Sequence, residues 1–340
     1  MKTYLLALAL LSSVSVLRAA QTLDMYVIDT EGGKALLIVA PGGESMLIDA
    51  GFPGYNDRDA IRIEEAAQAA GVKRFDYLVV THYDLDHVNN VPATVARIPA
   101  GTFVDHGPAA VKDLATTAAV KAYEAVVAKA EHLVVKAGDK IPFKGVDVLV
   151  VTSAGEAIKT PVAGGGAPNP FCERTPPMGW KGTNEDESEN AQSVGLLLTF
   201  GRFRMLDLGD LTWNKERALM CPNNPIGTVD VFMVSHHGND ISNSPALVHA
   251  LRPRVAIMNN GARKVGAPAT LKVLRSSPGL EALYQLHWSV RGGVEGNAPD
   301  EFIANLQDSP DGKWIKVSAS QDGSFTVTNG RTNASRTFKR

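Results

Sequence analysis

Short apolar segments that each end at an acidic residue or a histidine constrain this chain more than any other feature of its sequence. Asp49, His82, Asp210 and His236 each follow such a segment, three to five residues rich in Val, Ile, Leu and Met. Segments of this kind, bounded by turn residues, are typical of buried strands. Because helical segments alternate with the strands, we expect an α/β protein whose polar strand ends gather at one edge of its sheets.

The expected elements fall into two similar halves. In the first half we expect strands at 23–29, 35–39, 46–49 and 77–81, and helices at 58–70 and 112–135. In the second half we expect strands at 146–151, 194–200, 203–208, 230–235 and 255–259, and a helix at 245–251. Segment 160–190, rich in Gly, Pro and acidic residues, is predicted to be a long loop insertion. Without a repeat or a linker, residues 21–340 are expected to form a single domain.

The first twenty residues have the composition of a secretory signal peptide. Lys2 precedes a run of ~14 residues, mostly Leu, Ala, Val and Ser, and Ala19 and Ala20 close the segment. Such a run is short for a membrane span. We therefore expect 1–20 to be removed and the mature chain, without a membrane span, to be secreted or periplasmic. Cys172 and Cys221 are then structural, either paired in a disulfide or free.

The charge balance limits the partners that this chain is expected to bind. Lys and Arg number 34, Asp and Glu number 36, and the net charge is −2. Proteins that bind nucleic acid through bulk charge usually carry a basic excess. We therefore expect no tight binding of duplex nucleic acid, and favour a small-molecule or exposed phosphodiester substrate.

A dense set of metal-binding side chains follows the expected strand at 77–81. Within HYDLDH, two imidazoles and two carboxylates lie at His82, Asp84, Asp86 and His87. Metal sites need several lone-pair donors that converge at ~2 Å from the ion, and a turn after a strand supplies them from neighbouring positions. The sequence therefore predicts a metal site at this strand end.

Taken in order, the motifs LIDAG, HxDxDH, LGD and SHHG resemble those of the metallo-β-lactamase fold superfamily. Asp84, in place of the usual middle histidine, resembles the nuclease-like domain of ComEC-type competence proteins, as do segments 28–35 and 190–193. The resemblance extends from about Leu23 to Trp288. It implies a four-layer αββα sandwich and a metal-dependent hydrolase that holds one or two zinc ions, or manganese, at the strand edge.

The resemblance also implies how the donors are shared between two ions. His82 and Asp84 would bind the first ion, and Asp86 and His87 the second. Asp210 would bridge the two ions.

The remaining polar residues complete this implied site. His236 would be the last ligand of the second ion, His237 would face the substrate, and Asp49 would orient a ligand from behind. The superfamily usually has a further histidine where this chain continues with 152–155, Thr-Ser-Ala-Gly. His106, which follows a short strand, either fills that place or is a turn residue.

The expected chemistry is hydrolysis by a metal-bound hydroxide, with Asp86, Asp210 and His237 as the catalytic residues. A phosphodiester is the favoured substrate, because two dications suit a dianionic transition state and the resemblance is nuclease-like. A β-lactam or a lactone is the alternative, which Asp84 disfavours. A non-catalytic binding protein on a hydrolase fold is a third hypothesis.

Overall fold

The computed structural model describes residues 22–115, 117–178, 186–307 and 312–340. The predicted signal peptide at 1–20 lies outside the described residues. Within them, no helix combines the length and the apolar character needed to cross a bilayer.

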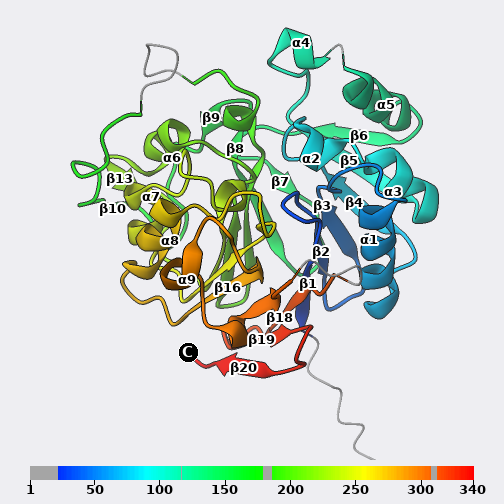
Figure 1. The fold of residues 1–340 in the computed structure, drawn as a ribbon. Coiled ribbons are helices and arrows are strands. Elements are labelled where there is room, and N and C mark those ends of the chain that lie inside the picture. The colour runs from blue at the N-terminus through cyan, green and yellow to red at the C-terminus, as the bar shows by residue number, and fades with distance from the viewer. Residues whose placement is uncertain (1–21, 116, 179–185, 308–311) are drawn as a thin grey trace, which may run out of the picture.

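Two nine-stranded sheets form the centre of the described chain (Figure 1). The first sheet contains both the N-terminal and the C-terminal strands, since the strand that begins at Ile315 pairs antiparallel with the strand that begins at Leu23. Its strands in spatial order are β20 (Ser335–Phe338), β19 (Phe325–Asn329), β18 (Ile315–Ala319), β1 (Leu23–Val27), β2 (Leu36–Val39), β3 (Ser45–Ile48), β4 (Phe75–Val79), β5 (Ala100–Asp105) and β6 (Glu131–Val134).

The second sheet comes from the middle of the chain. Its strands in spatial order are β17 (Ile303–Asn305), β16 (Ala282–His287), β15 (Val255–Met258), β14 (Val231–Met233), β12 (Phe203–Asp207), β11 (Gly195–Phe200), β8 (Asp147–Ser153) and β7 (Lys140–Ile141), and β9 (Glu156–Ala157) pairs with β8. A separate pair joins β10 (Ala167–Pro168) to β13 (Asn223–Asn224).

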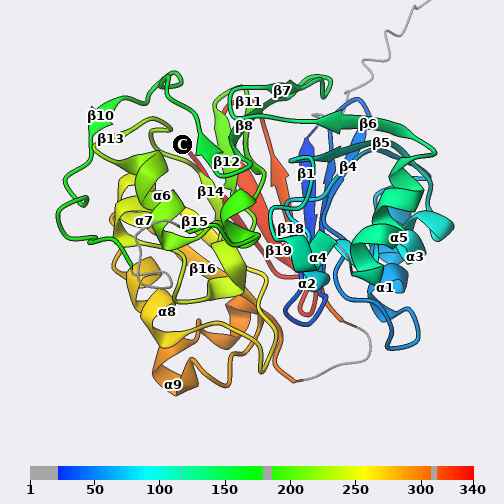
Figure 2. The same ribbon diagram turned by 90° about the horizontal axis from the view of Figure 1, so that it is seen from above.

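Helices cover the outer face of each sheet, and Figure 2 shows the two sheets between two helical layers. The first sheet carries α1 (Arg58–Ala69), α3 (Val91–Arg97) and α5 (Ala118–Val127), and the second carries α6 (Trp213–Met220), α7 (Pro245–Leu251) and α8 (Pro268–Arg275). The shorter helical segments are α2 (Leu85–Val88), α4 (Lys112–Ala115), α9 (Gly293–Gly296), η1 (Asn190–Gln192), η2 (Ser235–Gly238) and η3 (Asp300–Phe302).

Side-chain alternation along the strands explains the layers. In β1, Leu23, Met25 and Val27 belong to the core between the two sheets, whereas Tyr26 packs with the helices of the first sheet. All four side chains are buried, so the strand buries apolar side chains on both faces, as a sheet covered on both sides requires. The four-layer αββα sandwich predicted from the sequence is confirmed.

Segment 112–135 differs from its prediction as one long helix. The helix α5 ends at Val127, and Glu131–Val134 forms β6, which pairs in parallel with β5. His132 lies on this strand and contacts Asp105 at 2.8 Å. Pairing with the sheet edge has outweighed the helix propensity of the alanine-rich sequence.

Cys172 and Cys221 form a disulfide, with their Cα atoms 5.8 Å apart. The bond settles the two alternatives that the sequence left open for this pair. It ties the irregular segment after Thr160 to the end of α6. Up to Met178, that segment has β10 as its regular element, and residues 179–185 lie outside the described residues.

Candidate metal centre

The carboxyl ends of parallel strands from both sheets meet at the candidate site. In the first sheet β3, β4 and β5 run parallel, and Asp49, His82 and His106 follow them in turn. In the second sheet β12 and β14 run parallel, and Asp210 and His236 lie just beyond them. Parallel strands end at the same edge of a sheet, which is where ligand sites of α/β folds lie.

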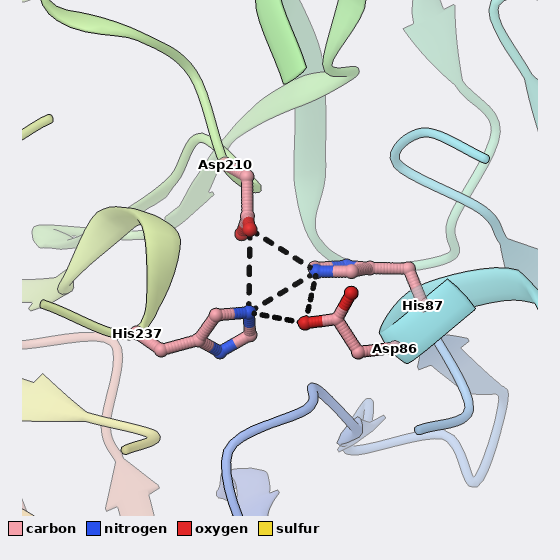
Figure 3. Close-up of side chains that lie close together, drawn as sticks. All are labelled: Asp86, His87, Asp210 and His237. Carbon is pink, nitrogen blue, oxygen red and sulfur yellow. Dashed lines mark hydrogen bonds and ion pairs between the residues drawn. The ribbon is translucent and has the colours of Figure 1, made fainter. Parts of the chain in front are cut away.

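Four side chains from these strand ends form a compact group, and we call it the four-residue group: Asp86, His87, Asp210 and His237 (Figure 3). Their ligand atoms lie within 4.8 Å of one another. The Nε2 atom of His237 lies 3.1 Å from Oδ2 of Asp86, 3.2 Å from Oδ2 of Asp210 and 3.2 Å from Nε2 of His87. That His87 nitrogen lies 3.3 Å from Oδ2 of Asp210 and 3.7 Å from Oδ2 of Asp86.

These separations fit one bound metal ion. Bonds from zinc to histidine nitrogen or carboxylate oxygen are about 2.0–2.1 Å long, so two ligands of a tetrahedral ion lie about 3.3 Å apart. The five donor–donor separations given above run from 3.1 to 3.7 Å and bracket that value, and all the donor atoms lie within 4.8 Å of one another. Two imidazoles and two carboxylates suit zinc, and manganese and iron accept the same donors.

Opposite charges in the four-residue group perturb one another's pKa values. Burial alone would raise the pKa of Asp86 and of Asp210, but the neighbouring imidazoles outweigh burial and hold both pKa values well below the usual range. Burial would lower the pKa of His87 and of His237, but the carboxylates outweigh it and raise both. A field that favours a proton on each imidazole also favours a dication among the four donors.

Asp49 lies directly behind His87. Its Oδ2 is 2.8 Å from Nδ1 of His87, and its two carboxylate oxygens also accept hydrogen bonds from the backbone N–H and the hydroxyl of Thr81, both at 2.8 Å. Asp49 has no exposed surface. The contact occupies Nδ1 of His87 and leaves Nε2 facing the four-residue group, which is the geometry that the predicted orienting role requires.

His237, rather than His236, belongs to the four-residue group, and that His236 binds an ion stays a prediction. Both residues have φ of 53°, and their rings lie 6.2 Å apart. The side chain of His237 is fully buried, whereas that of His236 is 13% exposed and its Nε2 lies 3.6 Å from Oδ2 of Asp210. The prediction assumed that the first residue after the strand faces the ion, but two successive left-handed residues turn the second one inward.

His82 and Asp84 lie beside the four-residue group. The Nε2 atom of His82 is 3.7 Å from Oδ2 of Asp84, and its ring centroid is 4.1 Å from that of His87. His82 has no exposed surface, and its Nε2 has no hydrogen-bond partner in the described part of the chain. Burial would raise the pKa of Asp84, but His82 outweighs burial and lowers it. That these two residues bind a further ion stays a prediction.

His106 lies outside the four-residue group and contacts a carboxylate of its own. Its Nε2 lies 2.8 Å from Oε1 of Glu189, which also accepts a hydrogen bond from the backbone N–H of Tyr83 at 3.2 Å. Burial would raise the pKa of Glu189, but His106 outweighs burial and lowers it. A buried carboxylate 83 residues away thus engages the side chain of His106, and that His106 serves as a metal ligand stays a prediction.

Two lysines that the sequence analysis did not propose as site residues also lie here. The side chain of Lys34 is 4% exposed, forms an ion pair with Asp207, and lies 4.0 Å from Oδ2 of Asp49. Lys264 forms an ion pair with Asp86. Both lysines occur in glycine-containing turns next to strands, GGK and GARKVG, and this shared setting is the signal that would have found them.

Residues 28–157 match the family model of the metallo-beta-lactamase superfamily. The fold is the metallo-β-lactamase fold. The matched segment includes the HxDxDH motif, whereas Asp210 and His237 lie beyond it. The superfamily predicted from the motifs is supported over this segment, and the more specific resemblance to ComEC-type proteins stays a prediction.

Individual similar proteins have different activities. Coenzyme F420H₂ oxidase of Methanothermobacter marburgensis is 30% identical over 120 residues, which are 35% of this chain and 28% of that protein. Igni18, a metallo hydrolase of Ignicoccus hospitalis, is 12% identical over 78% of this chain and 94% of its own, with a TM-score of 0.43. CmlA, a diiron β-hydroxylase of Streptomyces venezuelae, is 14% identical over 72% of this chain and 46% of its own, with a TM-score of 0.41.

Proposed function

We propose that this protein is a secreted metal-dependent hydrolase that cleaves a phosphodiester. The observation that carries the proposal is the four-residue group, in which four donor atoms lie within 4.8 Å of one another. Three of its members are fully or almost fully buried, and Asp86 reaches the surface with 14% of its side chain exposed. A metal held there is therefore within reach of a substrate.

Residues in and behind the four-residue group would have distinct parts in hydrolysis. A bound dication lowers the pKa of a coordinated water and polarises the scissile phosphoryl oxygen. Asp210 supplies one carboxylate oxygen to the four-residue group, and its Oδ1 is buried without a hydrogen-bond partner among the described residues. We infer that this carboxylate orients the attacking water rather than taking up its proton, because the neighbouring imidazoles hold the pKa of Asp210 well below its usual range. Asp49 holds the ring of His87, and Asp86 lies at the solvent side.

Three features support a phosphodiester as the substrate. His82 and Asp84 lie next to the four-residue group and offer donors for a second ion, and two dications suit a dianionic transition state. The HxDxDH motif resembles nuclease-like proteins. A net charge of −2 favours small or exposed phosphodiesters over long duplex DNA.

Two other activities remain as candidates for the test. A β-lactam or lactone is the hydrolytic alternative. The likeness to coenzyme F420H₂ oxidase favours a redox enzyme as a second candidate function, and that role requires a redox-active metal such as iron in place of zinc.

Secretion has its own support. The disulfide between Cys172 and Cys221 is of the kind that persists in oxidising compartments. The N-terminal composition described above adds to this support.

Metal analysis and turnover together test the proposed function. The full mature chain is analysed for bound metal as purified, then loaded with zinc or manganese and assayed with bis(4-nitrophenyl) phosphate and with a lactone, next to Asp86→Ala and the matched control His249→Ala on α7. We expect bound metal and turnover in the wild-type protein and in the control, and loss of both in Asp86→Ala. A protein that binds no metal overturns the proposal. Bound zinc with turnover of a lactone alone supports the hydrolytic alternative, and iron with no hydrolysis supports the redox enzyme.

A further inference from the structure

We propose that Lys264 binds an anionic oxygen of the substrate next to the metal site, so that the enzyme selects anionic over neutral esters. This inference rests on the proposed hydrolase function and names the substrate chemistry that the site prefers. Its basis is the position of one partly exposed lysine at the edge of the four-residue group.

Lys264 reaches the four-residue group from the solvent side. Its ammonium group forms an ion pair with Oδ2 of Asp86 and lies 4.6 Å from the centroid of the Phe52 ring. The side chain of Lys264 is 40% exposed, compared with 14% for Asp86. The lysine therefore stands between the donor atoms and the solvent from which a substrate arrives.

The backbone around Lys264 is closely held against the same site. The carbonyl oxygen of Lys264 accepts a hydrogen bond from Gly261 N at 3.1 Å, and Gly266 N donates to the carbonyl oxygen of His237 at 3.1 Å. A Cβ added to Gly32 would lie 2.9 Å from Cβ of Lys264, so the two turns touch. Only the flexible end of the lysine side chain is therefore free to change partner.

Two other cationic side chains, those of Lys34 and Arg58, form ion pairs with carboxylates other than Asp86. Lys34 is buried against Asp207, and Arg58 pairs with Asp59 at 2.7 Å. Their positive charges are balanced inside the protein, whereas that of Lys264 lies at the surface of the site.

The ammonium group of Lys264 and the metal site share one oxygen of Asp86. This sharing explains why the ammonium group is available to a substrate. The same Oδ2 atom of Asp86 lies 3.1 Å from Nε2 of His237, within the geometry that fits a metal ion. When that oxygen serves a dication, it attracts the ammonium group of Lys264 less strongly. A phosphodiester oxygen next to the site then offers the ammonium group a full negative charge at short range.

Two substrates that differ by one negative charge distinguish binding of an anionic oxygen by Lys264 from a general effect of Lys264 on activity. Methyl 4-nitrophenyl phosphate is an anionic diester, and dimethyl 4-nitrophenyl phosphate is the neutral triester with the same leaving group. The variants are Lys264→Met, the rescue variant Lys264→Arg, and Arg263→Met. Arg263 is exposed in the same loop, so its replacement removes one positive charge without touching the site.

In Lys264→Met we expect kcat/KM for the diester to fall about 10- to 100-fold, mainly through KM, because that is the range for loss of a hydrogen bond to a charged group. The triester should change less than about twofold, Lys264→Arg should recover most of the diester activity, and Arg263→Met should behave as the wild type. Equal losses for both substrates, or no loss for either, overturn the proposal.

Phosphate binding gives a readout that does not depend on turnover. Calorimetry with inorganic phosphate and zinc-loaded protein should show affinity at least about tenfold weaker in Lys264→Met than in Arg263→Met, with zinc binding intact in both. Equal phosphate affinity, or no binding by the wild type, overturns the role of Lys264. Failure of the wild type to bind zinc is a distinct result, which overturns the proposed function as well.

Discussion

The carboxylate of Asp49 contacts the imidazole of His87 at 2.8 Å, and neither side chain has any exposed surface. Asp49 lies just beyond β3 with φ of 60°, and there it also accepts two hydrogen bonds from Thr81, which lies just beyond β4. One carboxylate thus joins two parallel strands and determines which nitrogen of His87 faces the four-residue group. Metal affinity should depend on this contact even though Asp49 is not expected to bind the ion.

Replacement of Asp49 by alanine should lower zinc affinity about 10- to 100-fold, the range for partners that hold a ligating histidine. The matched variant Thr81→Val removes the hydroxyl contact but keeps the bond between Asp49 and His87, so its affinity should fall much less. Competitive zinc titration measures both constants, and circular dichroism verifies that the variants are folded. An unchanged zinc affinity in Asp49→Ala would contradict the orienting role.

His236 and His237 should affect metal binding differently. His237 contributes Nε2 to the four-residue group, so His237→Ala should lose about tenfold or more in affinity for the tightest zinc ion. His236 lies 3.6 Å from Asp210 and outside the group, so His236→Ala should retain that ion. Zinc stoichiometry and calorimetry on both variants test the distinction. A larger loss in His236→Ala than in His237→Ala would identify His236 as the metal ligand instead.

The local pattern of apolar and polar residues predicts much of the fold and part of the site. The helix expected at 58–70 is α1 at Arg58–Ala69, because its apolar residues recur at helical spacing up to a glycine. Asp49 and Asp210 were identified because each follows an apolar strand, and parallel strands bring such residues to one edge. These inferences needed only the spacing of apolar residues along the sequence and the direction of the strands.

Contacts between distant residues were beyond this kind of reasoning. Glu189 engages His106 from 83 positions away, and Lys264 reaches Asp86 across 178 positions. Neither pair leaves a periodic signal in the sequence. The presence of His237 rather than His236 in the four-residue group has a local cause, the left-handed backbone of η2, but such a conformation is uncommon for residues other than glycine.

Glu216 should make the protein less stable as the pH rises above about 5. Burial raises the pKa of this fully buried carboxyl to about 7, although it accepts hydrogen bonds from the backbone N–H groups of Asn243 and Ser244, both at 2.7 Å. Between 4.5, its unfolded pKa, and about 7, the folded protein binds more protons than the unfolded chain, so stability falls as pH rises. At 1.36 kcal/mol per pH unit, the loss approaches about 3 kcal/mol above pH 7.

Comparison with Glu216→Gln isolates this effect, because the amide does not titrate. The difference in free energy of unfolding between the variant and the wild type should shift by up to about 3 kcal/mol in favour of the variant between pH 5 and pH 8. Urea denaturation at several pH values measures it. A difference that stays constant over this range would show that the carboxyl does not titrate there.

Removal of the disulfide should lower stability while metal binding persists. Replacing both Cys172 and Cys221 by serine releases a constraint on a loop with a sequence separation of 49, which costs about 2–4 kcal/mol. The melting temperature should fall by roughly 3–6 °C. The segment keeps other attachments, since the side-chain amide of Asn169 donates to the carbonyl oxygens of Met220 and Ala246 at 3.0 and 2.8 Å.

Neither cysteine belongs to the four-residue group, so zinc affinity should stay within about twofold of the wild type. Thermal denaturation and zinc titration of the double variant measure both quantities. A large loss of zinc affinity would show that the loop around Cys172 supports the metal centre directly.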